Sequence, residues 1–224
     1  MRRTAALLLL LFLNSTAIAA PPKVTISYSP SLDTACALVR GYRIEAAWKD
    51  ELSKDLEGFR DMWARIGPRL LSTTEDITGK NFTDGSVSAY LTLCDLPSQS
   101  LRVGIVINMR YALSSFTSHP VPSRYKIGAL YHEILHRFVD AHMPAHSALL
   151  AQHHGEPARV REHLHLLALQ KAGYLALGMR DELSEVIDID GQLPDGFYKR
   201  AWDIVNRDRD AYLDYVNELK GAER

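Results

Sequence analysis

The sequence predicts an α+β fold, in which a small sheet precedes a helical C-terminal part. Two observations indicate this class. Strand-like apolar runs occur only in the first half of the chain, and three helical segments follow them. The 224 residues are enough for one domain with a sizeable core.

The composition is that of an ordinary globular protein, with 46% hydrophobic and 24% charged residues. Lys and Arg total 26 against 27 Asp and Glu, so the net charge of −1 gives no electrostatic reason to expect a nucleic acid partner. Two cysteines are too few for a disulfide-framework miniprotein or a four-cysteine zinc module.

The N-terminus has the three parts of a secretory signal peptide. Two arginines precede an apolar run over 5–13, and small residues end at Ala19. The apolar run is about nine residues, well short of the roughly 20 that span a bilayer. We therefore expect residues 1–19 to be a signal peptide and 20–224 to be a single domain. The protein would be exported, periplasmic or secreted, with no membrane span after cleavage near Ala19.

Export to an oxidising compartment would allow Cys36 and Cys94 to form a disulfide. The sequence does not decide this, since both could equally be small buried apolar side chains.

The first half of the mature chain begins with a strand over 23–28, where β-branched and polar residues alternate. Apolar residues at three- and four-residue steps predict a helix over about 31–71, which a Gly-Pro pair at 67–68 could interrupt. The polar segment 73–85 is expected to be a loop.

Two extended apolar runs follow, over 86–94 and 101–109. The short connection between them predicts neighbouring antiparallel strands. A mostly polar loop is expected over 114–125.

The second half is predicted to be mainly helical. Periodicity indicates helices over about 127–141, 157–177 and 197–219, with a short turn near 147–152. The acidic segment 181–196 is expected to be loop-like, except for one turn within it.

The chemistry is concentrated in a histidine cluster. All nine histidines lie between His119 and His165, and metal binding is the commonest reason for such a cluster. Within it, His132-Glu133-Ile134-Leu135-His136 forms an HExxH motif. On a helix, positions i and i+4 share a face, so both imidazoles can bind one ion. Glu133 would then lie beside a zinc-bound water and take its proton, and the hydroxide would attack a carbonyl.

This motif and its flanks, over about 101–178, resemble the zincin zinc metallopeptidases. The resemblance implies that His132 and His136 bind zinc and that Glu133 is the general base and acid. It also implies an edge strand above the active-site helix, where a substrate pairs as an added strand. The run 101–109 is the candidate for that strand.

The third zinc ligand does not follow the metzincin pattern HExxHxxGxxH. Val139 occupies the glycine position, where the chain must take a left-handed turn that a β-branched residue resists. His142 at the third-ligand position is therefore an accidental match.

The chain resembles the gluzincins more, in which a second helix supplies the third ligand. Glu156, Glu162 and His163 compete for this role. Glu156 and His163 are seven residues apart and share a helix face with Val160, Leu167, Gln170 and Tyr174. His163 is slightly favoured because it lies inside the helix, where it would be held more rigidly; Glu156 follows and Glu162 is third.

These observations predict an exported zinc-dependent hydrolase, a peptidase with one Zn²⁺ ion and a peptide or protein substrate. The residue that stabilises the oxyanion stays open among Tyr125, Tyr131, Tyr174, His146, His153 and His154. The alternative is a non-catalytic exported zincin-like domain that binds metal or a partner. Oligomeric state is not predicted.

Overall fold

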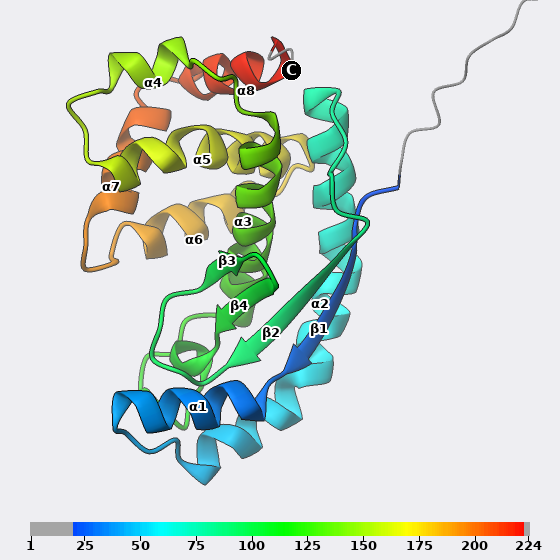
Figure 1. Cartoon of the computed structure of the whole chain (residues 1–224), viewed down its shortest axis with the longest axis vertical. Helices are drawn as coiled ribbons and strands as arrows, with labels where there is room; N and C mark the ends of the chain where they lie inside the picture. The colour runs from blue at the N-terminus through cyan, green and yellow to red at the C-terminus, as the bar shows by residue number, and fades with distance from the viewer. Residues whose placement is uncertain (1–19, 222–224) are drawn as a thin grey trace, which may run out of the picture.

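The computed structural model describes residues 20–221, so the predicted signal peptide lies outside the described residues. It confirms an α+β architecture, with the sheet and α1 (Pro30–Arg40) at one end and a helical part at the other (Figure 1). The long helix α2 (Ala46–Thr78) runs along the whole molecule. The helices after the sheet are α3 (Ser123–His142), α4 (Ala148–Gln152), α5 (Ala158–Ala176), α6 (Arg180–Asp190), α7 (Phe197–Val205) and α8 (Ala211–Gly221).

The sheet has four strands in the order β1-β2-β4-β3. The strands are β1 (Lys23–Tyr28), β2 (Ser86–Thr92), β3 (Gln99–Leu101) and β4 (Gly104–Asn108). β2 pairs with both β1 and β4 in parallel, in the registers Val24–Val87 and Leu91–Ile107. The prediction that the apolar runs 86–94 and 101–109 form neighbouring antiparallel strands is therefore wrong, because they contain the parallel strands β2 and β4.

The reason is an additional short strand, β3, in the connection. The chain leaves β2, forms β3 at the sheet edge and returns through a tight hairpin into β4. Gly104 begins β4 with φ 156°, and a Cβ there would lie 2.9 Å from the carbonyl oxygen of Ser88. β4 lies between β2 and β3, so β3, and not the predicted run 101–109, is the edge strand beside α3, and β1 is the other edge.

The predicted helix over 31–71 is two helices. Gly41 caps α1 in the left-handed conformation with φ 69°, and α2 begins five residues later. The Gly-Pro pair does not end α2, which continues through Pro68 to a second left-handed glycine cap at Gly79. The loop prediction for 73–85 is therefore wrong for its first half.

The polar end of α2 is helical because its buried polar groups are satisfied. The Thr74 hydroxyl lies 2.9 Å from the carbonyl oxygen of Leu70 and 2.7 Å from the Tyr131 hydroxyl. Glu75 accepts a hydrogen bond from the backbone N–H of Phe82 at 3.0 Å. A polar segment of this kind is indistinguishable from a loop by periodicity alone.

Cys36 and Cys94 form a disulfide, which joins α1 to the residues after β2 across a sequence separation of 58. The buried carboxylate of Asp33 reinforces this connection. It accepts hydrogen bonds from the hydroxyls of Tyr28 at 2.6 Å and Thr92 at 2.5 Å, and from the backbone N–H of Leu93 at 2.8 Å. The base of the molecule is thus fixed both covalently and by a satisfied polar network.

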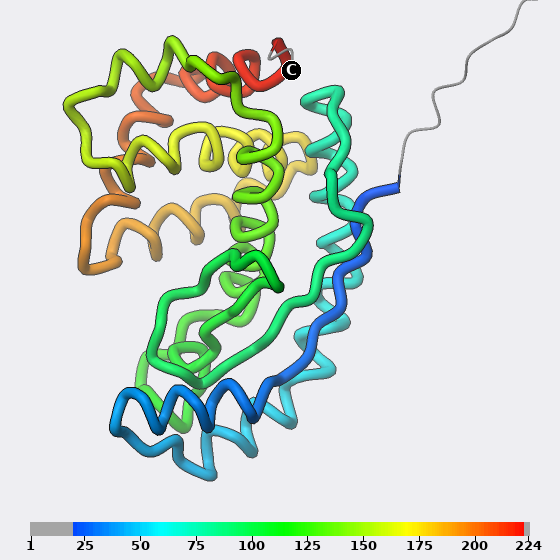
Figure 2. Tube along the Cα trace, in the orientation of Figure 1, coloured from blue at the N-terminus to red at the C-terminus, as the bar shows by residue number. Residues whose placement is uncertain are grey.

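Helices α3, α4 and α5 lie close to the predicted ranges. The predictions for 181–196 and for 197–219 need correction. The segment expected to be loop-like contains the helix α6. The single helix expected over 197–219 is interrupted at 206–210, which separates α7 from α8. α5 is the hub of this part and contacts α3, α6, α7 and α8 (Figure 2).

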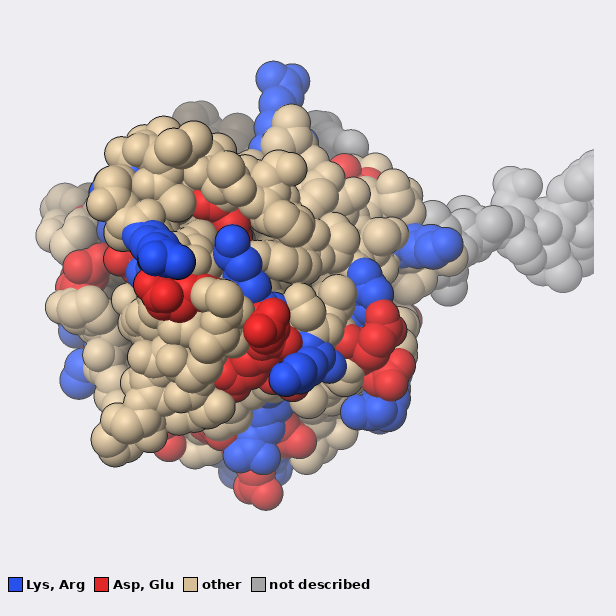
Figure 3. Space-filling model, turned by 90° about the horizontal axis from the view of Figure 1, so that it is seen from below, with Lys and Arg blue, Asp and Glu red and all other residues tan. Residues whose placement is uncertain are grey.

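The surface shows no segregation of charge on the face seen in Figure 3, where Lys and Arg side chains alternate with Asp and Glu. Within residues 20–221, no helix combines the length and the low polarity that a bilayer crossing requires.

Candidate metal centre

The HExxH motif lies in the middle of α3, the most buried helix that touches the sheet. Leu130, Ile134, Leu135 and Phe138 are all at most 1% exposed and anchor the helix in the core. The motif positions i and i+4 consequently lie on one side of a rigid helix. α3 packs against β3 and β4 on one side and α5 on another.

Two glycines allow α5 to approach α3 closely. A Cβ at Gly173 of α5 would lie 2.5 Å from the Tyr131 hydroxyl, and one at Gly128 of α3 would lie 2.9 Å from the Tyr174 hydroxyl. Each helix thus makes room for a tyrosine of the other. This reciprocal packing brings His163 of α5 opposite the HExxH face of α3.

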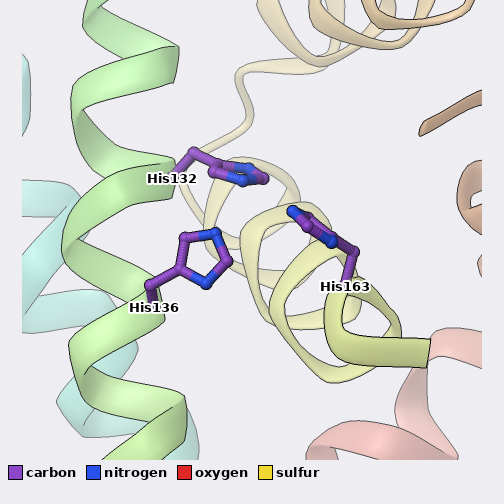
Figure 4. A group of neighbouring side chains, drawn as sticks. All are labelled: His132, His136 and His163. Atoms are coloured by element: carbon purple, nitrogen blue, oxygen red, sulfur yellow. The ribbon is translucent and has the colours of Figure 1, made fainter. Parts of the chain in front are cut away.

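His132, His136 and His163 converge, with ligand nitrogens all within 4.8 Å of one another. Their ring centroids are 5.0 to 5.3 Å apart. Figure 4 shows the three imidazoles pointing toward one another from two helices. Three such nitrogens are close enough to share one metal ion.

Hydrogen bonds select the tautomers of two of these rings. Nδ1 of His132 lies 3.1 Å from Oε1 of Gln170, and Nδ1 of His163 lies 2.6 Å from the carbonyl oxygen of Arg159. Both oxygens only accept, so each Nδ1 carries the hydrogen and each Nε2 keeps a lone pair. Nε2 of His132 also lies 3.4 Å from the Tyr198 hydroxyl. This is the arrangement that metal-binding histidines require.

The site keeps its histidines neutral. Burial lowers the pKa of His132 well below 6.5, with a further lowering by the neighbouring rings of His163 and His136. Burial also lowers the pKa of His136 to about 4 and that of His163. Neutral imidazoles are the form that binds a metal ion.

Glu133 is only 4% exposed. Burial raises the pKa of its carboxyl to about 8, although a hydrogen bond from the backbone N–H of Ser100 lowers the pKa by a smaller amount. It lines two pockets that meet at the cluster. The α6 pocket has a volume of about 610 Å³ and is bounded by Val186, Ile189 and Asp190 of α6, and also by His132.

The second pocket, the β3 pocket, has a volume of about 560 Å³. Gln99, Ser100 and Leu101 of the edge strand line it, together with His136 and His163. Pro97, Ser98, Glu133 and Tyr198 line both pockets. Glu133 and Tyr198 are neighbours of the three histidines, so the cluster lies where the pockets join.

Among the competing ligands, only His163 joins the two motif histidines. The Glu156 carboxylate accepts a 3.1 Å hydrogen bond from Nε of Arg200 and therefore does not complete the cluster. Glu162 is exposed and lines the β3 pocket without joining the cluster. Nε2 of His142 lies 2.8 Å from the carbonyl oxygen of Asn81, in keeping with an accidental match to the metzincin pattern.

His146 is exposed and lines neither pocket, whereas the other oxyanion candidates have structural partners. His153 lies 2.9 Å from the Tyr215 hydroxyl, and His154 lies 3.2 Å from the Ala151 carbonyl oxygen. The hydroxyl of Tyr125 donates to Asp190 at 2.9 Å. Tyr131 and Tyr174 serve the α3–α5 packing described above.

Tyr198 is the residue that the sequence analysis missed. It lies at the start of α7, 62 residues beyond His136 in the chain, and no local pattern singles it out. Gln170 was placed on the face of His163 by its helical spacing, but its contact with His132 could not be predicted from that spacing.

No family model, curated protein or solved structure matches the chain.

Proposed function

We propose that this protein is an exported zinc-dependent hydrolase of peptide bonds. The observation that carries the proposal is the convergence of three histidines beside a buried glutamate at the junction of two pockets. The motif order, with His132 and His136 on one helix and His163 on a second, supports a zincin-like and more specifically a gluzincin-like arrangement. A histidine would replace the glutamate that gluzincins use.

Nε2 of His132, Nε2 of His163 and a ring nitrogen of His136 would hold the metal, leaving a position for water or substrate. Three imidazoles with one open position are typical of catalytic zinc sites. A bound Zn²⁺ supplies Lewis acidity, which polarises a carbonyl and lowers the pKa of water toward neutrality.

Glu133 is placed to act as the general base and acid. It follows the first ligand directly on α3 and lines both pockets, so it can take a proton from the attacking water and return it to the leaving amine. Burial raises its pKa to about 8, and the positive charge of a bound cation would oppose this shift and favour the carboxylate that accepts the proton.

Tyr198 is placed to stabilise the charge that develops on the substrate oxygen. Its hydroxyl is 3.4 Å from Nε2 of His132, and its ring centroid is 4.9 Å from that of His163. A phenol keeps its proton here, because burial raises the Tyr198 pKa above its ordinary value. It can therefore donate a hydrogen bond to an oxyanion.

The edge strand β3 provides the surface for an extended substrate. Gln99–Leu101 pair with β4 on one side only, and they line the β3 pocket beside His136. A peptide that adds to this edge as a further strand would bring a carbonyl to the cluster. Arg137 holds the strand end through hydrogen bonds to Ser100 and to the Leu101 carbonyl oxygen.

The disulfide supports export, because such bonds persist in oxidising compartments. It agrees with the signal peptide that we propose for residues 1–19.

The test combines metal analysis with turnover of a proteome-derived peptide library, with products identified by mass spectrometry. We expect about one zinc per chain in the wild type and specific cleavage of some peptides. Glu133→Gln should retain zinc and lose about 10²- to 10⁴-fold in rate, since a general base contributes that much. Glu162→Gln, which alters an exposed carboxylate of the β3 pocket, is the matched control and should stay active.

Equal turnover by wild type and zinc-loaded Glu133→Gln contradicts the mechanism. Zinc binding by a wild type that cleaves no peptide supports the alternative of a non-catalytic metal-binding domain.

A further inference from the structure

The α6 pocket contains a cation that the proposed chemistry does not use. Lys126 lies on α3 and lines this pocket, yet it is only 7% exposed. It precedes Glu133 by seven residues, which is two helical turns, so the two side chains share a face about 10 Å apart along the helix axis.

Lys126 has no carboxylate partner within residues 20–221. Its described neighbour is the ring of Tyr125, whose centroid is 5.5 Å from Nζ. Burial lowers its pKa to about 8, and no acidic group opposes that shift. A buried ammonium without a counter-charge is costly to the fold, so its retention needs a reason.

Two of the three acidic groups of the same pocket are already engaged, and the third, Glu133, lies two helical turns from Lys126 on α3. Asp190 accepts hydrogen bonds from the hydroxyl of Tyr125 and from Nε1 of Trp202, each at 2.9 Å. Asp95 lies 3.4 Å from the guanidinium of Arg110 and accepts a hydrogen bond from Tyr111. Among the lining residues Lys126 is the one lysine or arginine, and its counter-charge is missing.

The remaining lining is largely apolar, with Leu96, Pro97, Val121 and Leu193 among its members. A carboxylate that enters such a pocket loses water, so a buried cation determines whether it binds. Apolar walls with few convergent polar groups are typical of specificity pockets.

We propose that Lys126 makes the α6 pocket a binding site for a carboxylate of the substrate. The carboxylate is an acidic side chain or the free C-terminus of a peptide. This inference rests on the proposed function, because it assumes that the scissile bond lies at Glu133. The spacing of about 10 Å corresponds to about three residues of extended chain.

The test measures peptide binding, which does not depend on turnover. The probes are N-acetylated hexa-alanine with a free C-terminus, its C-terminal amide, and amides in which a glutamate replaces each alanine in turn. Isothermal titration calorimetry is carried out on the mature protein with and without added zinc. We expect at least one carboxylate-bearing peptide to bind the wild type about tenfold more tightly than the all-alanine amide.

Lys126→Met should abolish that preference and Lys126→Arg should keep most of it. Lys199→Met, at an exposed position of α7, is the control and should leave the preference unchanged. A thermal melt of each variant confirms folding. If the wild type prefers the peptide with a free C-terminus, the pocket binds the terminal carboxylate. If it prefers an amide with an internal glutamate, the pocket binds an acidic side chain.

The inference is overturned by a folded Lys126→Met protein that keeps the preference, or by a wild type that shows no preference or no binding. The binding test of this inference and the hydrolysis test of the proposed function can fail independently. Carboxylate preference without hydrolysis retains the Lys126 site and removes the hydrolase, whereas hydrolysis without carboxylate preference does the opposite.

Discussion

Oε1 of Gln170 lies 3.1 Å from Nδ1 of His132, across the contact between α5 and α3. The Gln170 amide nitrogen lies 3.5 Å from the carbonyl oxygen of Gly128, which orients the amide so that its oxygen faces the ring. The hydrogen of His132 is thereby held on Nδ1, and Nε2 is left for a metal. The same helix that supplies His163 thus also orients a ligand of the neighbouring helix.

Gln170→Leu should lower zinc affinity about 10- to 100-fold, because His132 would lose the acceptor that fixes its tautomer. Competition with a chromophoric chelator measures the zinc affinity of each variant. Gln192→Leu changes an exposed glutamine that lines the α6 pocket; it is the control and should bind zinc as the wild type does. Unchanged affinity in the folded Gln170 variant would show that the hydrogen bond does not support metal binding.

The third ligand is tested by the pair His163→Ala and Glu156→Ala. The first should remove most of the zinc from the purified protein, because only two of the clustered imidazoles remain. The second should leave the zinc content unchanged, since Glu156 is held by Arg200. Elemental analysis of both proteins is sufficient. The reverse pattern would make Glu156 the ligand.

Tyr198→Phe should reduce kcat about 10²-fold with little change in KM or zinc content, because the hydroxyl would act on the transition state more than on the bound substrate. Tyr125→Phe is the matched control. Its hydroxyl is committed to Asp190, so the variant should retain near-normal kcat. Equal losses in both variants would indicate a general effect on the α6 pocket.

The sequence was most informative where one helix carries the signal. His132 and His136 lie four residues apart, so helical periodicity alone places them on one face, with Glu133 directly after the first. His163 was slightly favoured over Glu156 because it lies inside the helix. The ion pair that engages Glu156 with Arg200 joins residues 44 positions apart, so the sequence could not predict it. The roles proposed for Tyr198 and Lys126 could not be predicted from the sequence, because tertiary packing alone places these residues at the site.

The sheet illustrates the same limit. The strands β2 and β4 were recognisable as apolar runs, but β3 is three residues long and too short for a periodic pattern. Because β3 reverses the chain, its omission inverted the predicted direction of β4 and misplaced the edge strand. A short strand therefore changed the expected substrate surface although both long strands were found.

The last prediction concerns the stability cost of Lys126. Its pKa is about 8 in the folded protein and about 10.4 in an unfolded chain, so the charged form is destabilising to the fold. Between these two values the unfolded chain binds a proton that the folded chain has released, and the contribution of this group to stability therefore rises with pH. Full deprotonation removes a penalty of about 3 kcal/mol. Tyr125 beside it keeps its proton over this range, because burial and Asp190 raise its pKa.

We accordingly expect Lys126→Met to be more stable than the wild type at about pH 7, by up to about 3 kcal/mol, and the difference to shrink toward zero near pH 10. Urea unfolding at several pH values measures both proteins. Lys199→Met should show no such pH-dependent difference, because the Lys199 side chain is 63% exposed and its ammonium is paired with Asp203 at 3.2 Å. A constant difference between wild type and Lys126→Met across this range would mean that Lys126 is charged and satisfied in the fold. A difference that shrinks as pH rises would mean that the Lys126 charge destabilises the free protein, as expected of a cation that a bound ligand neutralises.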